Sequence, residues 1–281
     1  SGRRGKHRGP CNQGCWPVTF AFRTGNTLAQ QPLSELDEPA MKLLVINPNT
    51  TATMTQKIDA VARRFARPGT EVVTEQPKTG PASIQGYLDI ARSLDGILGV
   101  AERHSDADAT VIACFDDTGL DALRCMLTGP VIGIGEASFH AASMISSRFS
   151  VITTLPRSVA GLYENLAKYG MSARCAGIRA ADVPVLALER DPQLARTRIE
   201  AQVKAAVDQD GADAVVLGCS GMTDLAESIS TQFGIPVIDG IGCAVAMAEA
   251  FFSAGLLTSK VGAYAIESDD IATLSNAAAR H

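Results

Sequence analysis

Short, continuous apolar runs alternate with amphipathic segments along most of this chain, and this alternation constrains the fold more than any other feature. The runs are rich in Val and Ile, which is typical of strands that are buried on both faces. They predict strands at residues 43–47, 71–74, 110–113, 130–134, 149–153, 185–188, 214–217 and 237–238. Helices are expected at residues 52–65, 84–102, 117–127, 136–145, 157–169, 192–208, 222–232 and 243–254. The predicted fold class is therefore α/β, with parallel sheets covered by helices.

The order of elements restarts near residue 149, which indicates an internal repeat. The segment Val45-Ile-Asn-Pro-Asn-Thr50 resembles Val151-Ile-Thr-Thr-Leu-Pro156. Cys114 follows Asn49 by 65 residues, and Cys219 follows Thr154 by the same 65 residues. We therefore expect two similar lobes, 41–145 and 146–265, each a parallel sheet flanked by helices, with exchange of terminal elements allowed. A pseudo-twofold relation between the lobes would put an active site between them.

The first 40 residues lack this pattern and are predicted to be an extension outside the fold. They are rich in Gly, Arg, Gln and Pro, and they carry five basic and three acidic residues. The extension is either sequence upstream of a natural start at Met41 or a basic functional arm. Cys11 and Cys15 have the spacing of half a zinc site, but no second pair lies near them. Residues 266–281 are expected to form a C-terminal tail.

Composition excludes several classes of function. The formal net charge of −5 argues against a nucleic-acid-binding protein. The chain contains no apolar run of about 20 residues, and its first 40 residues contain no contiguous apolar core of a signal peptide, so no membrane partner is expected. Seven cysteines is an odd number, and a chain of 281 residues needs no disulfide framework. We therefore expect reduced cysteines and a cytoplasmic location.

Two cysteines share a distinctive local setting. Cys114 lies in Val111-Ile-Ala-Cys-Phe-Asp-Asp117, and Cys219 lies in Val215-Val-Leu-Gly-Cys-Ser-Gly221. Each ends an apolar run and precedes a turn and a helical segment, where backbone N–H groups and the helix dipole would favour a thiolate. A single cysteine of this kind is as well explained by packing at a strand end. Two in matching positions suggest a pair of acid and base groups, whereas Cys125, Cys175 and Cys243 are expected only to pack.

Polar residues follow several of the other predicted strands. Asn49 and Thr50 either cap the following helix or contact a ligand, and Thr153 and Thr154 occupy the corresponding place in the second half. Ser83, after a Pro/Gly loop, is equally a helix cap or a ligand contact. All five are candidate binding residues.

Three other patterns have weaker interpretations. Asp116 and Asp117 are either a paired-carboxylate site or, as we favour, charges at a helix N-terminus on the turn that positions Phe115. Gly133-x-Gly135-x-x-Ser138 resembles a dinucleotide fingerprint but lacks its third glycine. Between residues 41 and 280 the only histidines are His104 and His140, so no metal site is predicted.

Five motifs resemble those of the hydantoin racemases, members of the aspartate/glutamate racemase superfamily that includes the allantoin racemases. They are Val45-Ile-Asn-Pro-Asn-Thr-Thr51, Gly80-Pro-Ala-Ser-Ile84, Val111-Ile-Ala-Cys-Phe-Asp-Asp117, Phe149-Ser-Val-Ile-Thr-Thr-Leu-Pro156 and Leu217-Gly-Cys-Ser-Gly-Met222. The resemblance covers about residues 41–265. It implies a homo-oligomeric racemase with two α/β lobes that needs no cofactor, and in which Cys114 and Cys219 are the two bases. Ser220 departs from the alanine expected at its position.

Racemisation removes a proton from one face of a stereocentre and returns one to the other. Two cysteines suit this chemistry, one as thiolate base and the other as thiol acid. Loss of the C5 proton from a hydantoin ring gives an enolate, which needs hydrogen-bond donors placed in advance. The candidate donors are the backbone N–H groups of Phe115, Asp116, Ser220 and Gly221.

The resulting hypothesis is a racemase of 5-substituted hydantoins that uses no metal, pyridoxal phosphate or nucleotide. Allantoin is itself a 5-substituted hydantoin, so an allantoin racemase is the nearest alternative. An amino-acid racemase fits the motifs less well. A decarboxylase that protonates an enolate with one cysteine, and a non-catalytic binding protein with duplicated lobes, are alternatives of other classes.

Overall fold

The computed structural model describes residues 41–265 of the chain. The predicted extension 1–40, with Cys11 and Cys15, and the predicted tail 266–281 lie outside the described residues. No helix in the described part has the length and apolar character required to cross a membrane.

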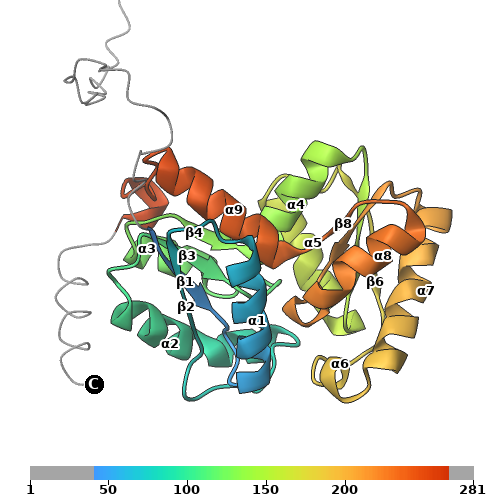
Figure 1. The fold of residues 1–281 in the computed structure, drawn as a ribbon, viewed down its shortest axis with the longest axis horizontal. Coiled ribbons are helices and arrows are strands. Elements are labelled where there is room, and N and C mark those ends of the chain that lie inside the picture. The colour runs from blue at the N-terminus through green and yellow to red at the C-terminus, as the bar shows by residue number, and fades with distance from the viewer. Residues whose placement is uncertain (1–40, 266–281) are drawn as a thin grey trace, which may run out of the picture. The chain divides into compact units, whose positions relative to one another are not determined.

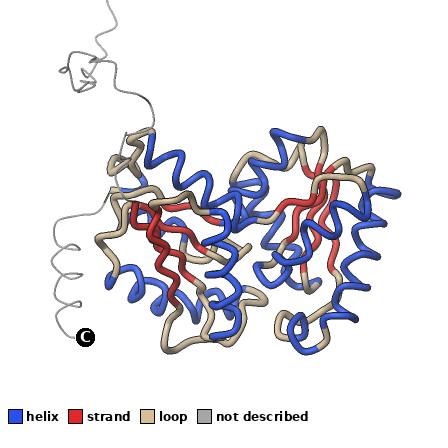
Figure 2. The backbone as a smooth tube through the Cα atoms, viewed as in Figure 1, coloured by secondary structure: helices blue, strands red, loops and turns tan. Residues whose placement is uncertain are grey.

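Two four-stranded parallel sheets form the framework, as the α/β prediction requires (Figures 1 and 2). The first sheet has the order β2-β1-β3-β4, and the second has the equivalent order β6-β5-β7-β8. The strands are β1 (Met41–Ile46), β2 (Thr70–Glu75), β3 (Ala109–Ile112), β4 (Val131–Gly133), β5 (Phe149–Thr153), β6 (Cys175–Ala180), β7 (Ala214–Leu217) and β8 (Val237–Ile238). The central strands β1, β3, β5 and β7 are almost wholly buried, which explains their continuous apolar sequences.

Helices connect the strands and cover the sheets. They are α1 (Ala52–Phe65), α2 (Tyr87–Arg103), α3 (Leu120–Met126), α4 (Ile134–Ile145), α5 (Val159–Lys168), α6 (Ala187–Arg190), α7 (Pro192–Asp210), α8 (Ala226–Phe233) and α9 (Gly240–Ser253). Short 3₁₀ turns span η1 (Pro156–Ser158), η2 (Ser220–Leu225) and η3 (Gly262–Tyr264). The helices predicted from residues 84 and 117 begin only at Tyr87 and Leu120, and the one predicted at 222–232 is a 3₁₀ turn followed by α8.

The strand predicted at residues 185–188 is wrong. The strand paired with β5 is instead β6, whose residues Cys175–Ala180 are all only partly buried at the sheet edge. An edge strand with a glycine and an arginine lacks the uniform apolar run that identified the other strands. Val185 and Leu188 are apolar for another reason, because they are buried in the segment around α6.

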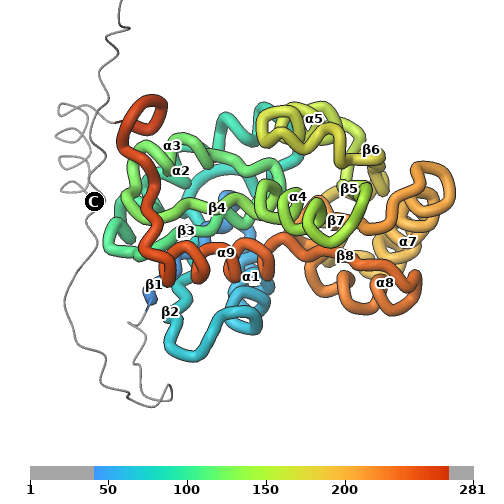
Figure 3. The backbone as a smooth tube through the Cα atoms, turned by 90° about the horizontal axis from the view of Figure 1, so that it is seen from above, coloured from blue at the N-terminus to red at the C-terminus, as the bar shows by residue number. Residues whose placement is uncertain are grey.

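The last helix of each half packs against the sheet of the other half. Helix α9 follows β8 in the chain but contacts β1, β3 and β4 of the first sheet, as well as α1 and α4. Helix α4 follows β4 but contacts β7 and β8 of the second sheet. Figure 3 shows α9 lying beside α4 and α1, over the first sheet. This reciprocal packing forms a core cluster that joins the two repeats.

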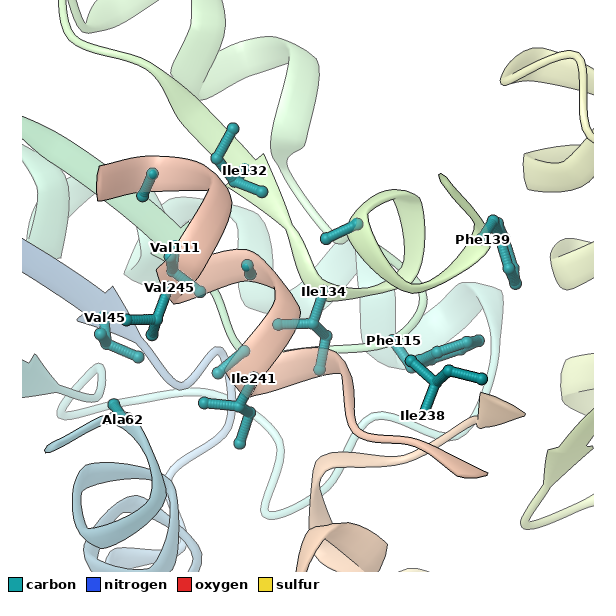
Figure 4. Packing of buried hydrophobic residues seen from close by; sticks show 14 of the residues in the cluster. Val45, Ala62, Val111, Phe115, Ile132, Ile134, Phe139, Ile238, Ile241 and Val245 are labelled. Atoms are coloured by element: carbon teal, nitrogen blue, oxygen red, sulfur yellow. The ribbon is translucent and has the colours of Figure 1, made fainter. Parts of the chain in front are cut away.

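The centre of that core joins residues of both sheets (Figure 4). Phe139 of α4 stacks on Phe149 of β5 with ring centroids 5.8 Å apart, and Phe115 meets Phe139 edge to face at 5.4 Å. Ile241 and Val245 of α9 belong to the same buried cluster. Phe115 directly follows Cys114, so the packing of its ring fixes the backbone beside that cysteine.

The loop after β3 is also held by the carboxylate of Asp117. This carboxylate accepts hydrogen bonds from the backbone N–H groups of Gly135 (2.9 Å) and Glu136 (2.8 Å) at the start of α4, and from the hydroxyl of Tyr169 (2.8 Å). Asp117 has a φ of 52°, a left-handed conformation that aspartate tolerates better than most residues. The expected placement of Asp117 at a helix N-terminus is thus confirmed, although the helix is α4 rather than α3, and burial raises the pKa of its carboxyl group to about 7.

The same contact explains the glycines of the dinucleotide-like pattern. A Cβ at Gly133 would collide with the Asp117 carboxylate, and one at Gly135 would collide with the carbonyl oxygen of Phe115. Ser138 donates a hydrogen bond to the carbonyl of Ile134 (2.5 Å). These small residues therefore allow the loop after β3 to approach α4.

Gly135→Ala is expected to lower the free energy of unfolding by about 1–3 kcal/mol, because the new methyl group is forced against the Phe115 carbonyl. Gly99→Ala is the matched control. Gly99 also lies within a helix, and a Cβ there meets only Arg103, at 3.8 Å. The Gly99→Ala substitution should leave the free energy of unfolding unchanged or raise it by about 0.5–1 kcal/mol, as measured by chemical denaturation. Equal stabilities of the two variants would contradict the close approach of the loop after β3 to α4.

Candidate active site

Cys114 and Cys219 line one cavity, at the carboxyl ends of β3 and β7. Strand register gives them equivalent positions. Ile112 pairs with Ile46 of β1, and Leu217 pairs with Ile152 of β5, so each cysteine lies two residues beyond a paired strand residue. Ala113 and Gly218, the residues just before them, donate equivalent hydrogen bonds of 2.8 Å to the carbonyls of Ile46 and Ile152.

The strand register shifts the correspondence between the two halves by one residue in the loops that follow β1 and β5. Counted from the paired strand residues, Asn47 corresponds to Thr153 and Pro48 corresponds to Thr154. Asn49 therefore lies one residue further along its loop than Thr154 does. The equal 65-residue spacings do not mark strictly equivalent residues, although Asn49 and Thr154 both reach the cavity.

The cavity receives residues from both sheets. Its polar lining comes from the loops that follow β1, β3, β5 and β7, and its apolar lining includes side chains from α1 and two other loops. The lining residues are Asn49, Met54, Ile84, Ala113, Cys114, Phe115, Asp116, Thr153, Thr154, Ser158, Val185, Gly218, Cys219 and Ser220. Because parallel strands carry their carboxyl ends to one edge, two equivalent sheets bring these loops together.

The two thiols have similar backbone surroundings. The backbone N–H groups of Asp116 and Gly221, each two residues after a cysteine, act to lower the pKa of Cys114 and Cys219 respectively. The Sγ of Cys114 also lies 3.6 Å from the hydroxyl of Thr118.

Burial outweighs those donors in both cysteines. It raises the pKa of Cys219 to about 11, and it raises the pKa of Cys114 well above the usual range, with a further increase from the charge of Asp116. The expected lowering of the thiol pKa by a helix N-terminus is therefore wrong. Helix α3 begins only at Leu120, six residues after Cys114, and Cys219 precedes a 3₁₀ turn rather than an α-helix.

The other predicted binding residues divide into two groups. Asn49, Phe115, Asp116, Thr153, Thr154 and Ser220 line the cavity, whereas Thr50, Ser83 and Gly221 are not among its lining residues. The side chain of Thr50 reaches the Pro81 carbonyl (3.4 Å). The hydroxyl of Ser83 accepts a hydrogen bond from Gln85 (2.9 Å).

Asn49 is not itself the N-cap residue of α1, but its side chain binds the residue that is. The residue at the N-cap of α1 is Thr51, and the side chain of Asn49 accepts its backbone N–H (2.9 Å). The Asn49 amide oxygen also accepts a hydrogen bond from Asn47 (3.2 Å). This network holds the buried Asn49 side chain at the cavity wall.

Six lining residues were not singled out from the sequence: Met54, Ile84, Ala113, Ser158, Val185 and Gly218. Ser158 lies at the end of η1, close after the Thr153-Thr154 pair, which is the one signal that pointed toward it. Val185 comes from the segment mistaken for a strand, and its N–H donates to the Gln85 side chain (3.3 Å) in the other half of the chain. Such contacts depend on how distant loops meet, which periodicity does not reveal.

The remaining candidates belong to the framework. His104 pairs with Glu75 at the end of β2, and His140 is a partly buried residue of α4. Cys125 and Cys175 direct their thiols at backbone carbonyls, and Cys243 packs against the main core cluster. Within residues 41–265 no cluster of three or more potential ligands that could hold a metal ion is found.

Comparison with known proteins agrees with this arrangement. The family model for Asp/Glu/Hydantoin racemase matches residues 43–248. A protein named hydantoin racemase from Rhizobium meliloti is 47% identical over 228 residues, covering 80% of this chain and 94% of that protein. One of the same name from Pseudomonas sp. (strain NS671) is 42% identical, covering 80% and 91%.

A solved structure shows the same fold with related sequence. The structure titled allantoin racemase from Klebsiella pneumoniae superposes with a TM-score of 0.79 and is 43% identical, covering 81% of this chain and 94% of its own. The relatives are thus racemases, and their similarity extends over both sheets and the cavity between their strand ends. The chain belongs to the Asp/Glu/Hydantoin racemase family and is an isomerase of the racemase class.

Proposed function

We propose that this enzyme interconverts the D and L forms of 5-substituted hydantoins, with Cys114 and Cys219 as two bases acting from opposite faces of the ring. The observation that carries the proposal is the equivalent placement of both thiols at one cavity, each two residues beyond a paired strand residue. A packing role for both cysteines would not require this equivalence. The relatives named hydantoin racemase support the substrate class.

The proton balance of the reaction is simple. A thiolate takes the C5 proton, and the electron pair of the C–H bond passes into the ring to give an enolate. The opposite thiol then donates its proton to the other face of C5, so the new C–H bond forms as the S–H bond breaks. The enzyme ends with the thiol and thiolate exchanged, ready for the reverse direction. No electron leaves the substrate, so the proposed chemistry requires no redox cofactor.

The enolate oxygen needs hydrogen-bond donors within the cavity. The candidate donors are the backbone N–H groups of Phe115, Asp116, Ser220 and Gly221, which follow the two cysteines. Asn49 and Thr154 add buried polar side chains on the same cavity wall. We propose that these groups bind the ring carbonyls, because donors fixed before reaction stabilise developing charge most effectively.

The lining argues for a neutral ring rather than a free amino acid. It contains one acidic side chain, Asp116, and neither lysine nor arginine. The carboxylate of an acidic amino acid would find no cation there and would be repelled by Asp116. A hydantoin ring instead presents carbonyl acceptors and N–H donors, which match the Asn, Thr and Ser side chains of the lining.

Cellular context completes the proposal. The five cysteines of the described part are free thiols, which suits the reducing cytoplasm. We also propose that the enzyme acts without a metal or organic cofactor and as a homo-oligomer, on the strength of the family resemblance.

The function is tested by incubating each enantiomer of a small hydantoin panel, allantoin included, with reduced enzyme and following chirality. We expect racemisation beyond the spontaneous rate for at least one member. If no member is racemised, the proposal is wrong. Racemisation of allantoin but not of alkyl hydantoins would make the enzyme an allantoin racemase, the alternative suggested by the name of the Klebsiella protein.

Cys114→Ser and Cys219→Ser should each abolish racemisation, since each removes one of the two proton carriers. In D₂O, each variant should still exchange the C5 proton of the one enantiomer that faces its remaining cysteine. Proton NMR measures that exchange. Cys125→Ser is the control and should retain full activity, because its thiol contacts a carbonyl away from the cavity. Full racemisation by either test variant would instead indicate a one-base mechanism.

The value of kcat/KM should rise with pH. The pKa of Cys219 is raised to about 11 and that of Cys114 lies higher, so near neutral pH only about 10⁻⁴ of the more acidic thiol is ionised. Below the thiol pKa the thiolate fraction grows tenfold per pH unit, which predicts a slope near +1 in log(kcat/KM) across the neutral range. Steady-state rates over that range check the slope. A flat profile would mean that the thiolate is already formed.

A further inference from the structure

One charged group in the cavity has no role in the proposed proton transfers. Asp116 is the only acidic residue of the lining, and no side-chain hydrogen bond or ion pair to its carboxylate is found within residues 41–265. Its backbone carbonyl accepts a hydrogen bond from the Asn165 side chain (3.1 Å). Burial raises the pKa of this carboxyl group to about 6, with nothing to offset it. Near neutral pH the group is thus mostly an ionised acceptor without a donor.

The neighbouring residue shows how unusual this is. The carboxylate of Asp117 is more deeply buried but has three donors, from Gly135, Glu136 and Tyr169. The carboxylate of Asp116, by contrast, is only partly buried and has no protein donor within residues 41–265. Its negative charge opposes the chemistry, since it contributes to the raised pKa of both Cys114 and Cys219. An acidic group that lines the cavity, hinders thiolate formation and has no protein partner is best explained by a ligand that supplies the donor.

Asp116 lies on the outer side of the cavity. The polar residues Asn49, Thr153 and Thr154 are all less than 5% exposed, whereas Asp116 is only partly buried. Its charge also acts on the hydroxyl of Tyr87, an exposed residue at the start of α2. A ring that reaches the buried thiols would lie among the deeper polar residues, with its C5 substituent directed toward Asp116.

We propose that Asp116 is a specificity-determining residue that accepts a hydrogen bond from an N–H group on the C5 substituent, so that the preferred substrate is a hydantoin with a nitrogen-linked substituent such as the ureido group of allantoin. This inference rests on the proposed function and names the substrate of the same site. An alkyl substituent would leave the carboxylate unpaired, and an anionic substituent would be repelled by it.

The same contact can serve both enantiomers. In a two-base racemisation the hydrogen on C5 changes faces, while the three other groups on that carbon keep nearly the same places. A hydrogen bond to the substituent therefore persists from one enantiomer, through the planar enolate, to the other. Asp116 would accelerate both directions equally, as the equilibrium between enantiomers requires.

The test compares two substrates in two forms of the enzyme. The ratio of kcat/KM for allantoin to that for 5-isobutylhydantoin is measured in the wild type and in Asp116→Leu, which removes the acceptor and the charge at similar size. Any change in thiol ionisation affects both substrates and cancels in the ratio. We expect the ratio to fall about 10- to 100-fold, the effect of losing a hydrogen bond to a charged group.

Other outcomes would overturn the inference. Equal losses for both substrates would indicate a contact with a ring N–H. Equal gains, or no change, would leave Asp116 with only an electrostatic effect on the thiols. Asp116→Asn provides a second variant should the leucine variant fold poorly, and it should shift the ratio in the same direction. Asp208→Asn removes a carboxylate that pairs with Lys204 on the exposed surface of α7, and it should leave the ratio unchanged.

A binding measurement separates this inference from the proposed function. If the wild type racemises neither compound, the proposed function fails, but calorimetric titration of both compounds still reports on Asp116. Selective weakening of allantoin binding in Asp116→Leu would support the contact. Equal binding of allantoin by wild type and variant would overturn it.

Discussion

Hydrogen bonding between parallel strands determines where the two cysteines lie, and the candidate site depends on this constraint. Ala113 and Gly218 continue the strand hydrogen bonds to Ile46 and Ile152, so the next residue in each half emerges at the same height above its sheet. The reciprocal packing of α4 and α9 then joins the two halves into one core. Phe115 and Asp117, on either side of Asp116, fix the loop after Cys114 to that core.

Much of this arrangement is predictable because it follows from burial. The Val- and Ile-rich runs identify β1, β3, β5 and β7 since those strands are covered on both faces, and the matching sequences around Cys114 and Cys219 identify the cavity. Strand β6 escapes prediction because an edge strand needs no apolar run. Val185 misleads for the converse reason, since an irregular segment that covers a cavity is as apolar as a strand.

The electrostatics of the site could not be predicted in the same way. A motif shows which N–H groups lie near a thiol, but not how completely water is excluded, and here exclusion of water raises the pKa of both thiols. The lack of a protein donor for the Asp116 carboxylate is likewise visible only in the folded cavity. Burial makes each thiolate scarce but strongly basic, which suits removal of a proton from carbon. A bound C5 substituent that supplies a donor to Asp116 would weaken its opposition to thiolate formation.

The central claim is that one thiol removes the proton and the opposite thiol returns another. The most direct test follows the wild-type enzyme in D₂O from a single enantiomer of a substrate, with chirality and C5 deuterium measured together at early times. Two bases predict that each product molecule carries deuterium, while the remaining substrate keeps its hydrogen. Deuterium appearing in the remaining substrate as fast as in the product would mean that a single base serves both faces, and it would contradict the account.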